Sequence, residues 1–143
     1  MVFELLIQRA MLFTVCIFLF SGCTQQDPNK ASVSGMVTFN GEPIADGSIS
    51  FIPTDGNGGP SAGGSILAGK YSIAQSKGPM IGMNRVEIVA VRETGKMVSY
   101  GAGPEMPERI SYIPAKYNEV SELTEDLKQG HNEIHFELSD VEQ

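Results

Sequence analysis

Apolar and polar residues alternate along several short stretches of the chain, which is the pattern of β-strands with one buried face. In the stretch 32–39, for example, Val33 and Val37 alternate with serine and threonine. We expect strands at 32–39, 47–53, 65–67, 70–74, 84–93 and 132–138. The side chains expected to face inward are Val33, Val37, Phe39, Ile49, Phe51, Ile66, Tyr71, Ile73, Val86, Ile88, Ala90, Ile134, Phe136 and Leu138. The pattern predicts an all-β fold.

Turn signals separate these stretches. Asn40-Gly41 is a dipeptide favoured where both turn residues need positive φ. Ala68-Gly69 lies between two short strands and predicts a tight hairpin. The glycine-rich stretch 54–64 and the proline-containing stretch 94–116 are both expected to be mostly loop.

The stretch 118–129 is ambiguous from its pattern alone. Val120, Leu123 and Leu127 fall at helical spacing, and Gly130 stands where a helix C-cap would. Periodicity therefore favours a helix here, and a strand remains the alternative.

The N-terminus carries an export signal. Eleven residues from Ala10 to Phe20 hold no charge, Arg9 precedes them, and the small residues Ser21 and Gly22 follow. This run is too short for a membrane span, which needs about 20 apolar residues. Extending it back toward the start would bury charges at a cost of about 2.5–3.5 kcal/mol each. We expect a signal peptide over 1–22 rather than a membrane anchor.

The end of that signal, Leu19-Phe20-Ser21-Gly22-Cys23, resembles the lipobox of bacterial lipoproteins. The resemblance implies cleavage between Gly22 and Cys23 and attachment of diacylglycerol to the Cys23 thiol. Phe20 departs from the family, which usually has leucine there. The alternative is an incidental cysteine after an ordinary signal peptide, which would make this a plain secreted domain. By the same resemblance, Thr24 in place of aspartate favours the outer membrane of the cell envelope.

Cysteine usage agrees with lipidation. Cys16 lies in the segment to be removed, so Cys23 is the one cysteine of the mature chain and no internal disulfide can form. Two or three acyl chains anchor far more firmly than the single chain that binds marginally. The expected organisation is a signal peptide at 1–22, a lipidated N-terminus and tether at 23–31, a folded domain at 32–138 and an acidic tail at 139–143.

The net charge of −7 argues against nucleic acid as a partner, because phosphate binding needs clustered Lys and Arg. The leader holds one acid, Glu4, and one base, Arg9, so its removal leaves this charge unchanged. The expected partner is the membrane, reached through the lipid on Cys23, together with an envelope protein or a glycan.

The domain as a whole is similar to the carboxypeptidase-regulatory-like, or transthyretin-like, β-sandwich domain of small bacterial lipoproteins. The segments that carry the resemblance are VSGMVTFNGEPIADGSISFIP, GKYSI, KGPMIGMNRVEIV, YIPAKYN and the Gly-Xaa-Asn before FEL. The resemblance implies a two-sheet antiparallel sandwich of about seven strands in a prealbumin-like Greek key, with a strand rather than a helix within 118–129. It implies no catalysis and a structural or interaction role.

Candidates for chemistry are few, and we expect no cofactor and no metal. His131 and His135 lie about 13 Å apart along a strand, too far to share one ion whose bonds are about 2 Å, and are read as solvated. The tetrad Asp55-Gly56-Asn57-Gly58 opens like a calcium loop, but Ile66 stands where its bidentate acid would be. The scattered methionines favour filler in a small core and loops over a copper site, since no Cys or paired His accompanies them.

No catalytic residue is expected. Hydroxyisourate hydrolases of transthyretin-like fold need a Tyr-Arg-Gly-Ser end that this chain lacks. The predicted function is a non-catalytic, lipid-anchored envelope module with a structural or protein-interaction role. The alternative is a carbohydrate- or peptide-binding lipoprotein that uses the 94–116 loop, where Tyr100, Tyr112 and Tyr117 are the candidate exposed aromatics.

Overall fold

The computed structural model describes residues 27–54, 56, 58–99 and 101–140. These residues form a β-structure with two short 3-10 turns, η2 (Gln75–Lys77) and η3 (Ala115–Tyr117). The strands are β1 (Ala31–Phe39), β2 (Glu42–Pro43), β3 (Asp46–Pro53), β4 (Ala62–Leu67), β5 (Lys70–Ile73), β6 (Gly82–Val98), β7 (Met106–Ser111), β8 (Thr124–Leu127), β9 (Gly130–Glu133) and β10 (Phe136–Leu138). The all-β prediction is confirmed.

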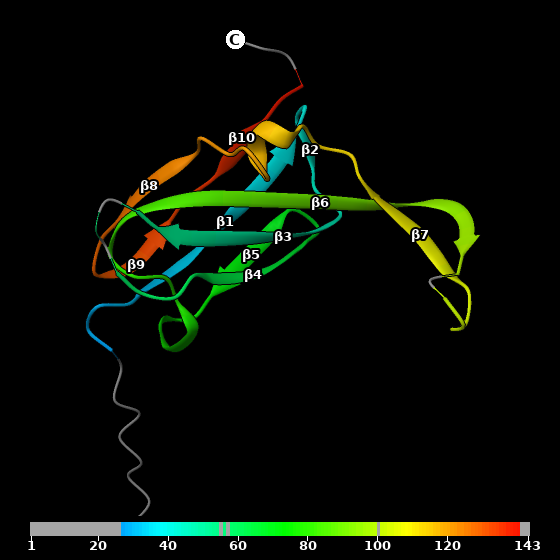
Figure 1. Ribbon diagram of the computed structural model, residues 1–143. Coiled ribbons are helices and arrows are strands. Elements are labelled where there is room, and N and C mark those ends of the chain that lie inside the picture. The colour runs from blue at the N-terminus through cyan, green and yellow to red at the C-terminus, as the bar shows by residue number, and fades with distance from the viewer. Residues whose placement is uncertain (1–26, 55, 57, 100, 141–143) are drawn as a thin grey trace, which may run out of the picture.

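All ten strands belong to one hydrogen-bonded sheet, with the order β10-β1-β5-β4-β3-β6-β7 along its main path. Pairing is antiparallel except where β1 meets β9 and β10 in parallel. Figure 1 shows the sheet strongly curled into a half-barrel, with the long strand β6 crossing the whole molecule.

A single curled sheet stands where the family resemblance implies two sheets. The reason lies in β6 and β1, each of which has neighbours on both edges. β6 pairs with β3 along one edge, and with β8 and then β7 along the other. β1 likewise pairs with β5 on one side and with β9 and β10 on the other. The hydrogen bonding is therefore continuous around the curl.

The curl encloses one apolar core. Its fully or almost fully buried apolar members are Ala31, Val33, Val37, Ile44, Ile49, Phe51, Ile66, Tyr71, Ile73, Val86, Ile88, Ala90, Ile113, Leu127, Phe136 and Leu138. Most of the inward positions expected from the alternation are among them. Phe39 and Ile134 are only partly buried and pack against this core.

Both predicted tight turns are confirmed. Asn40 and Gly41 have φ of 51° and 84°, and Ala68 and Gly69 have φ of 48° and 77°. At Gly69 the positive φ coincides with a close approach, because a Cβ there would lie 2.7 Å from the Cβ of Pro43. Glycine is therefore required at this position twice over.

The ambiguous stretch 118–129 contains a strand, β8, which pairs antiparallel with the start of β6. The strand that the family resemblance implies here is confirmed, and the helix that periodicity favours is wrong. Leu127 is buried from this strand and Leu123 packs beside it, so their spacing reflects packing from an extended chain.

The prediction of loop for 94–116 is wrong over much of its length. β6 continues to Val98, and β7 pairs with it to make a two-stranded ribbon that projects from the body in Figure 1. We call this ribbon, residues 92–110, the arm. Pro107 fits in β7 because this strand ends the sheet and its outer edge needs no donor. Gly95, with φ of 81°, accompanies a register shift between Glu93 and Met97.

Two smaller boundaries also differ from expectation. β4 begins at Ala62, inside the stretch 54–64 that was expected to be loop, because Ala62 pairs with Phe51. The expected strand 132–138 is divided into β9 and β10, with Ile134 and His135 between them. The alternation of apolar residues runs unbroken across this interruption, so it gave no sign of it.

The body begins before the boundary expected for the tether. Ala31 opens β1 and is fully buried. Ahead of it, the carbonyl of Asn29 accepts a hydrogen bond from the Ile81 amide, and the carbonyl of Asp27 accepts one from the Gln75 side chain. The chain is thus attached to the body from Asp27 onward.

The predicted signal peptide at 1–22 and the cleavage and lipidation positions, Gly22 and Cys23, lie outside the described residues. Within 27–140, apart from the three gaps, no helix has the length and apolarity needed to cross a bilayer.

Candidate functional site

An open groove of about 590 Å³ lies where β1, β4 and β5 meet the break between β9 and β10. Its lining combines apolar, hydroxyl and charged groups: Ser34, Gly35, Met36, Ser65, Leu67, Lys70, Tyr71, Ser72, Glu133 and His135. Two sets of contacts position these side chains, one around Tyr71 and the other around His135.

Tyr71 closes the floor of the groove. Its ring is buried between Phe51 and Phe136, with ring centroids 6.4 Å away in each case. Its hydroxyl donates a 2.9 Å hydrogen bond to the carbonyl oxygen of Ile134. Burial raises the pKa of the Tyr71 phenol well above its usual range, and the charge of Glu125 raises it further. The phenol is therefore neutral, and its hydrogen bond to Ile134 links β5 to the break between β9 and β10.

The same carbonyl explains the interruption between β9 and β10. A Cβ on Gly35 would lie only 1.7 Å from the oxygen of Ile134, so the two backbones touch. Because the Ile134 carbonyl bonds to Tyr71, it leaves the ladder, while the Ile134 amide still donates to Ser34. Gly35 and Tyr71 together thus divide the predicted strand 132–138.

The His135 side chain provides a hydrogen-bond acceptor for β1 at the break between β9 and β10. Its Nδ1 accepts a 3.0 Å hydrogen bond from the Met36 amide, which fixes the proton of the neutral ring on Nε2. That Nε2 lies 3.6 Å from a carboxylate oxygen of Glu133. The ring is exposed, but its hydrogen bond links β1 to the start of β10. The interpretation of His135 as a merely solvated side chain missed this link.

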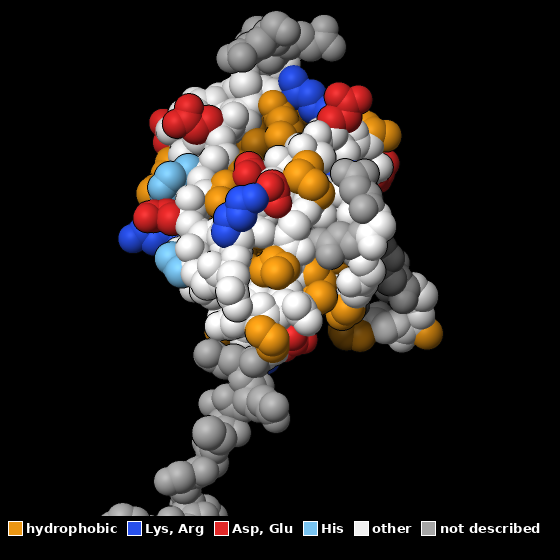
Figure 2. Space-filling view, turned by 90° about the vertical axis from the view of Figure 1, so that its left-hand side faces the viewer, with side chains coloured by type: hydrophobic (Ala, Val, Ile, Leu, Met, Phe, Trp, Pro, Cys, Tyr) orange, Lys and Arg blue, Asp and Glu red, His pale blue; other side chains and the backbone are white. Residues whose placement is uncertain are grey.

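His131 bridges the neighbouring strands in a similar way. Its two ring nitrogens each lie 3.3 Å from a serine hydroxyl, Nδ1 from Ser32 and Nε2 from Ser34. Among the described residues it has no carboxylate partner that would orient it as a general base. Figure 2 shows both histidines at the margin of one face, with acidic and basic side chains beside them.

The candidate aromatics do not form one platform. Tyr112 is half-buried in edge contact with Phe39 at 6.0 Å, and the guanidinium of Arg92 lies 5.8 Å from its ring centroid. Tyr117 is half-buried, its hydroxyl donates to the Ser139 carbonyl, and the ammonium of Lys116 lies 5.2 Å from its ring centroid. A cation of the chain itself thus lies against each ring. Tyr100 lies outside the described residues.

The methionines correct one part of an earlier expectation, that some of them fill the core. None of the five positions Met36, Met80, Met83, Met97 and Met106 belongs to the buried core. Met97 and Met106, both on the arm, are 55% and 56% exposed. They are therefore not core filler.

The part of the chain that the structure describes contains no cluster of metal ligands, since no three His, Cys, Asp or Glu side chains converge there. Asp55 and Asn57 of the calcium-like tetrad lie outside that part. Gly56 between them has φ of 77°, as expected for a glycine turn.

Sequence reasoning identified Tyr71 as inward-facing. It placed the two histidines on one strand, whereas His131 lies in β9 and His135 lies in the break after it. It missed Gly35, Lys70 and Glu133 as neighbours of the groove. A signal was present for Gly35, since a glycine in the middle of a strand marks a close backbone approach. Lys70 and Glu133 look in sequence like any solvated charge.

Comparison with known proteins finds no match among protein-family models, curated proteins or solved structures.

Proposed function

We propose that this protein is a non-catalytic module of the bacterial cell envelope, anchored by lipid on Cys23, with a structural or protein-interaction role. It is exported by its signal peptide, and the outer membrane is the favoured location.

The observation that carries this proposal is the short distance along the chain between Cys23 and the folded body. Asp27 is already hydrogen-bonded to the body, so only Thr24, Gln25 and Gln26 intervene. Even fully extended, four residues span about 14 Å. An acylated Cys23 would therefore hold a rigid β-structure directly at the membrane surface, which suits a positioning or contact module.

The groove supports a non-catalytic reading. The Tyr71 hydroxyl, His135 Nδ1 and both ring nitrogens of His131 are engaged by strand or hydroxyl groups. A catalytic nucleophile needs an adjacent base that a third group orients. Ser34 beside His131 is the nearest approach to such a pair, but His131 faces a second serine instead of an orienting acid.

Metabolic labelling with a radioactive fatty acid tests the anchor. We expect label on the wild type, on a Cys16→Ser control and none on Cys23→Ser, because only Cys23 follows the lipobox-like sequence. Equal absence of label from the wild type and Cys23→Ser would refute the lipoprotein assignment and leave a plain secreted domain.

We further propose that the half-barrel is a distant relative of the transthyretin-like sandwich, its one curled sheet corresponding to the two sheets of that family. The ordered β1-to-β6 region, with its core positions and its turns at Gly41 and Gly69, supports this relationship. An experimentally determined structure that superposes on a member of that family over β1 to β6 would test it.

A second candidate is a carbohydrate- or peptide-binding lipoprotein that uses 94–116. The observation in its favour is that β7 is the last strand of the sheet path and pairs only with β6 among the described strands. Such an edge can accept a peptide as an added strand. The cations against the rings of Tyr112 and Tyr117 favour peptide over sugar.

A peptide and glycan array with the lipid-free domain tests this candidate. A peptide hit that disappears on Ser111→Pro would support it, because the Tyr112 amide donates to Ala90 of β6 and the neighbouring Ser111 amide therefore faces the free edge. A hit unaffected by that substitution would place binding elsewhere.

A further inference from the structure

The arm changes in polarity from its base to its tip. Charged residues cluster at the base, where Arg109 forms an ion pair with Asp46 of β3 and Thr94 donates a 2.6 Å hydrogen bond to Glu108. Along the sequence from Met97 to Pro107, the only charged residue is Glu105. The outer part of the arm is therefore mostly apolar, while the base is polar and fixed to the body.

The last paired residues of the arm, Met97, Val98, Met106 and Pro107, which we call its tip, are apolar on both faces of the ribbon. Met97 pairs with Pro107, and Val98 pairs with Met106. Directly opposed residues share a face and successive residues alternate, so one face carries Met97 with Pro107 and the other carries Val98 with Met106. A protein groove would cover one face of such a ribbon, whereas a lipid interface surrounds the ribbon on both.

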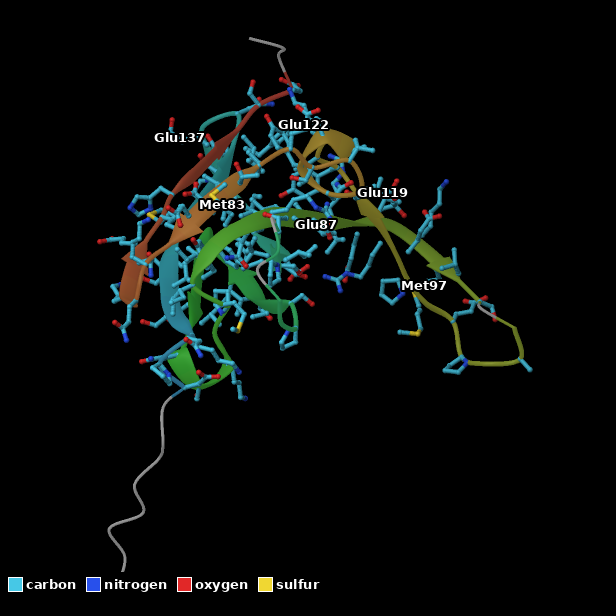
Figure 3. All side chains as sticks on the ribbon, turned by 60° about the vertical axis from the view of Figure 1, so that its left-hand side comes forward. Met83, Glu87, Met97, Glu119, Glu122 and Glu137 are labelled. Atoms are coloured by element: carbon cyan, nitrogen blue, oxygen red, sulfur yellow. The ribbon has the colours of Figure 1, made fainter. Side chains whose placement is uncertain are left out.

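The tip also lies at the end of the molecule where the described chain begins, at Asp27. Figures 1 and 3 differ by a rotation about the vertical axis, so heights agree between them. In both, the tip reaches the level of η2 and the start of the described chain, while the C-terminal end and η3 lie at the opposite end. Figure 3 shows Met97 well below Glu122.

The surface around the chain's starting point suits the same orientation. The Gln75 side chain donates to the Asp27 carbonyl, which attaches η2 to this end, and Lys77 is exposed there. A cation beside the anchor is compatible with phosphate headgroups. Asp27, four residues after Cys23 in the sequence, and the tip therefore lie at one level.

We propose that the tip of the arm, residues Met97, Val98, Met106 and Pro107, enters the interface of the membrane to which Cys23 is attached. This inference rests on the proposed lipid anchor. A single lipid attachment point at Cys23 does not by itself fix the orientation of the body. A second contact by the arm fixes the orientation of the half-barrel above the bilayer, with the groove held at a constant angle to the surface.

The test uses the full lipidated chain in vesicles of phosphatidylethanolamine with a minor fraction of phosphatidylglycerol. Since Cys16 is removed and Cys23 acylated, Met97→Cys supplies a single free thiol for an environment-sensitive fluorophore. The matched control is Val120→Cys, because Val120 is 64% exposed and its amide donates to the carbonyl of Ala115 in η3, which lies at the opposite end. We expect emission at position 97 to shift to shorter wavelength and to be quenched by lipids brominated on their acyl chains, with neither change at position 120.

Adding Met106→Asp to the Met97→Cys chain should abolish the shift, because it places a charge on the other face of the tip. Protein that floats with the vesicles but shows the same emission at 97 and 120 would overturn the contact and leave the anchor intact. Protein that does not float with the vesicles would overturn the anchor and this inference together.

Discussion

The hydroxyl of Tyr71 donates a hydrogen bond to the carbonyl oxygen of Ile134, 63 residues away along the chain. This contact ties β5 to the interruption between β9 and β10 and forms the floor of the groove. Around it, the ring of Tyr71 contributes to the core and the backbone of Gly35 touches the same carbonyl. Stability and groove shape thus depend on the same few atoms.

Tyr71→Phe should lower the free energy of unfolding by about 1–2 kcal/mol, because it removes the donor and leaves a carbonyl without its partner while keeping the buried ring. Urea denaturation monitored by circular dichroism measures the change. Tyr112→Phe is the matched control, since no hydrogen bond of the Tyr112 hydroxyl holds the described structure together, and we expect a change within about 0.5 kcal/mol. Equal stability of Tyr71→Phe and the wild type would show that this hydrogen bond contributes nothing.

Gly35→Ala should be far more disruptive, costing about 4 kcal/mol or more. The added Cβ would lie 1.7 Å from the oxygen and 2.7 Å from the carbon of the Ile134 carbonyl, and neither backbone can move without breaking β1 pairing. Thermal unfolding measures the loss. Gly58→Ala makes the same chemical change where no atom lies within 4 Å, and should leave the melting temperature nearly unchanged. A tolerated Gly35→Ala would contradict the close approach of the two strands.

These contacts show what alternation along the chain can and cannot predict. Val33, Phe51 and Ile88 were predicted inward because period two is a local property of an extended chain. The break at Ile134 was not, because it arises from Tyr71 and Gly35, which are distant in sequence. The polar and apolar pattern of 132–138 is the same with or without it.

The arm escaped prediction for a related reason. Pro107 and Gly95 signal a loop when read locally, yet an edge strand tolerates the proline and a register shift uses the glycine. In the sequence, nothing distinguishes Met97 and Met106 from apolar residues that are buried. Only the topology, which places them on a ribbon beyond the core, makes their exposure meaningful.

Glu125 should make the protein less stable as the pH rises. Burial raises the pKa of Glu125 in the folded state, so the folded protein holds this proton more tightly than the unfolded chain does. The stability that this gives is complete below the unfolded pKa, about 4.3, and is lost as the pH rises through the higher folded pKa. Glu125→Gln keeps the group neutral at every pH. We therefore expect it to be stabilising near pH 7, by about 0.5 kcal/mol or less because the site is only partly buried, and to lose that advantage at pH 3. Denaturation midpoints at both pH values measure this, and an advantage that is the same at both would exclude the titration of Glu125 as its cause.

Asn84 offers a sharper test of polar satisfaction inside the sheet. It is fully buried, and its Nδ2 donates 2.8 Å hydrogen bonds to the carbonyls of Met80 and Gly82, while its Oδ1 has no partner among the described residues. Asn84→Ala should cost about 1–3 kcal/mol, because two acceptors lose their donor.

Asn84→Asp keeps the shape but turns a carboxylate toward those two carbonyls, so at neutral pH it should be less stable than Asn84→Ala. Acidification protonates the carboxyl, which can then donate one hydrogen bond, and should reverse that order. Chemical denaturation of both variants at pH 7 and pH 4 measures this reversal in their order of stability. An Asn84→Asp variant as stable as the wild type at pH 7 would mean that these two hydrogen bonds do not hold the start of β6.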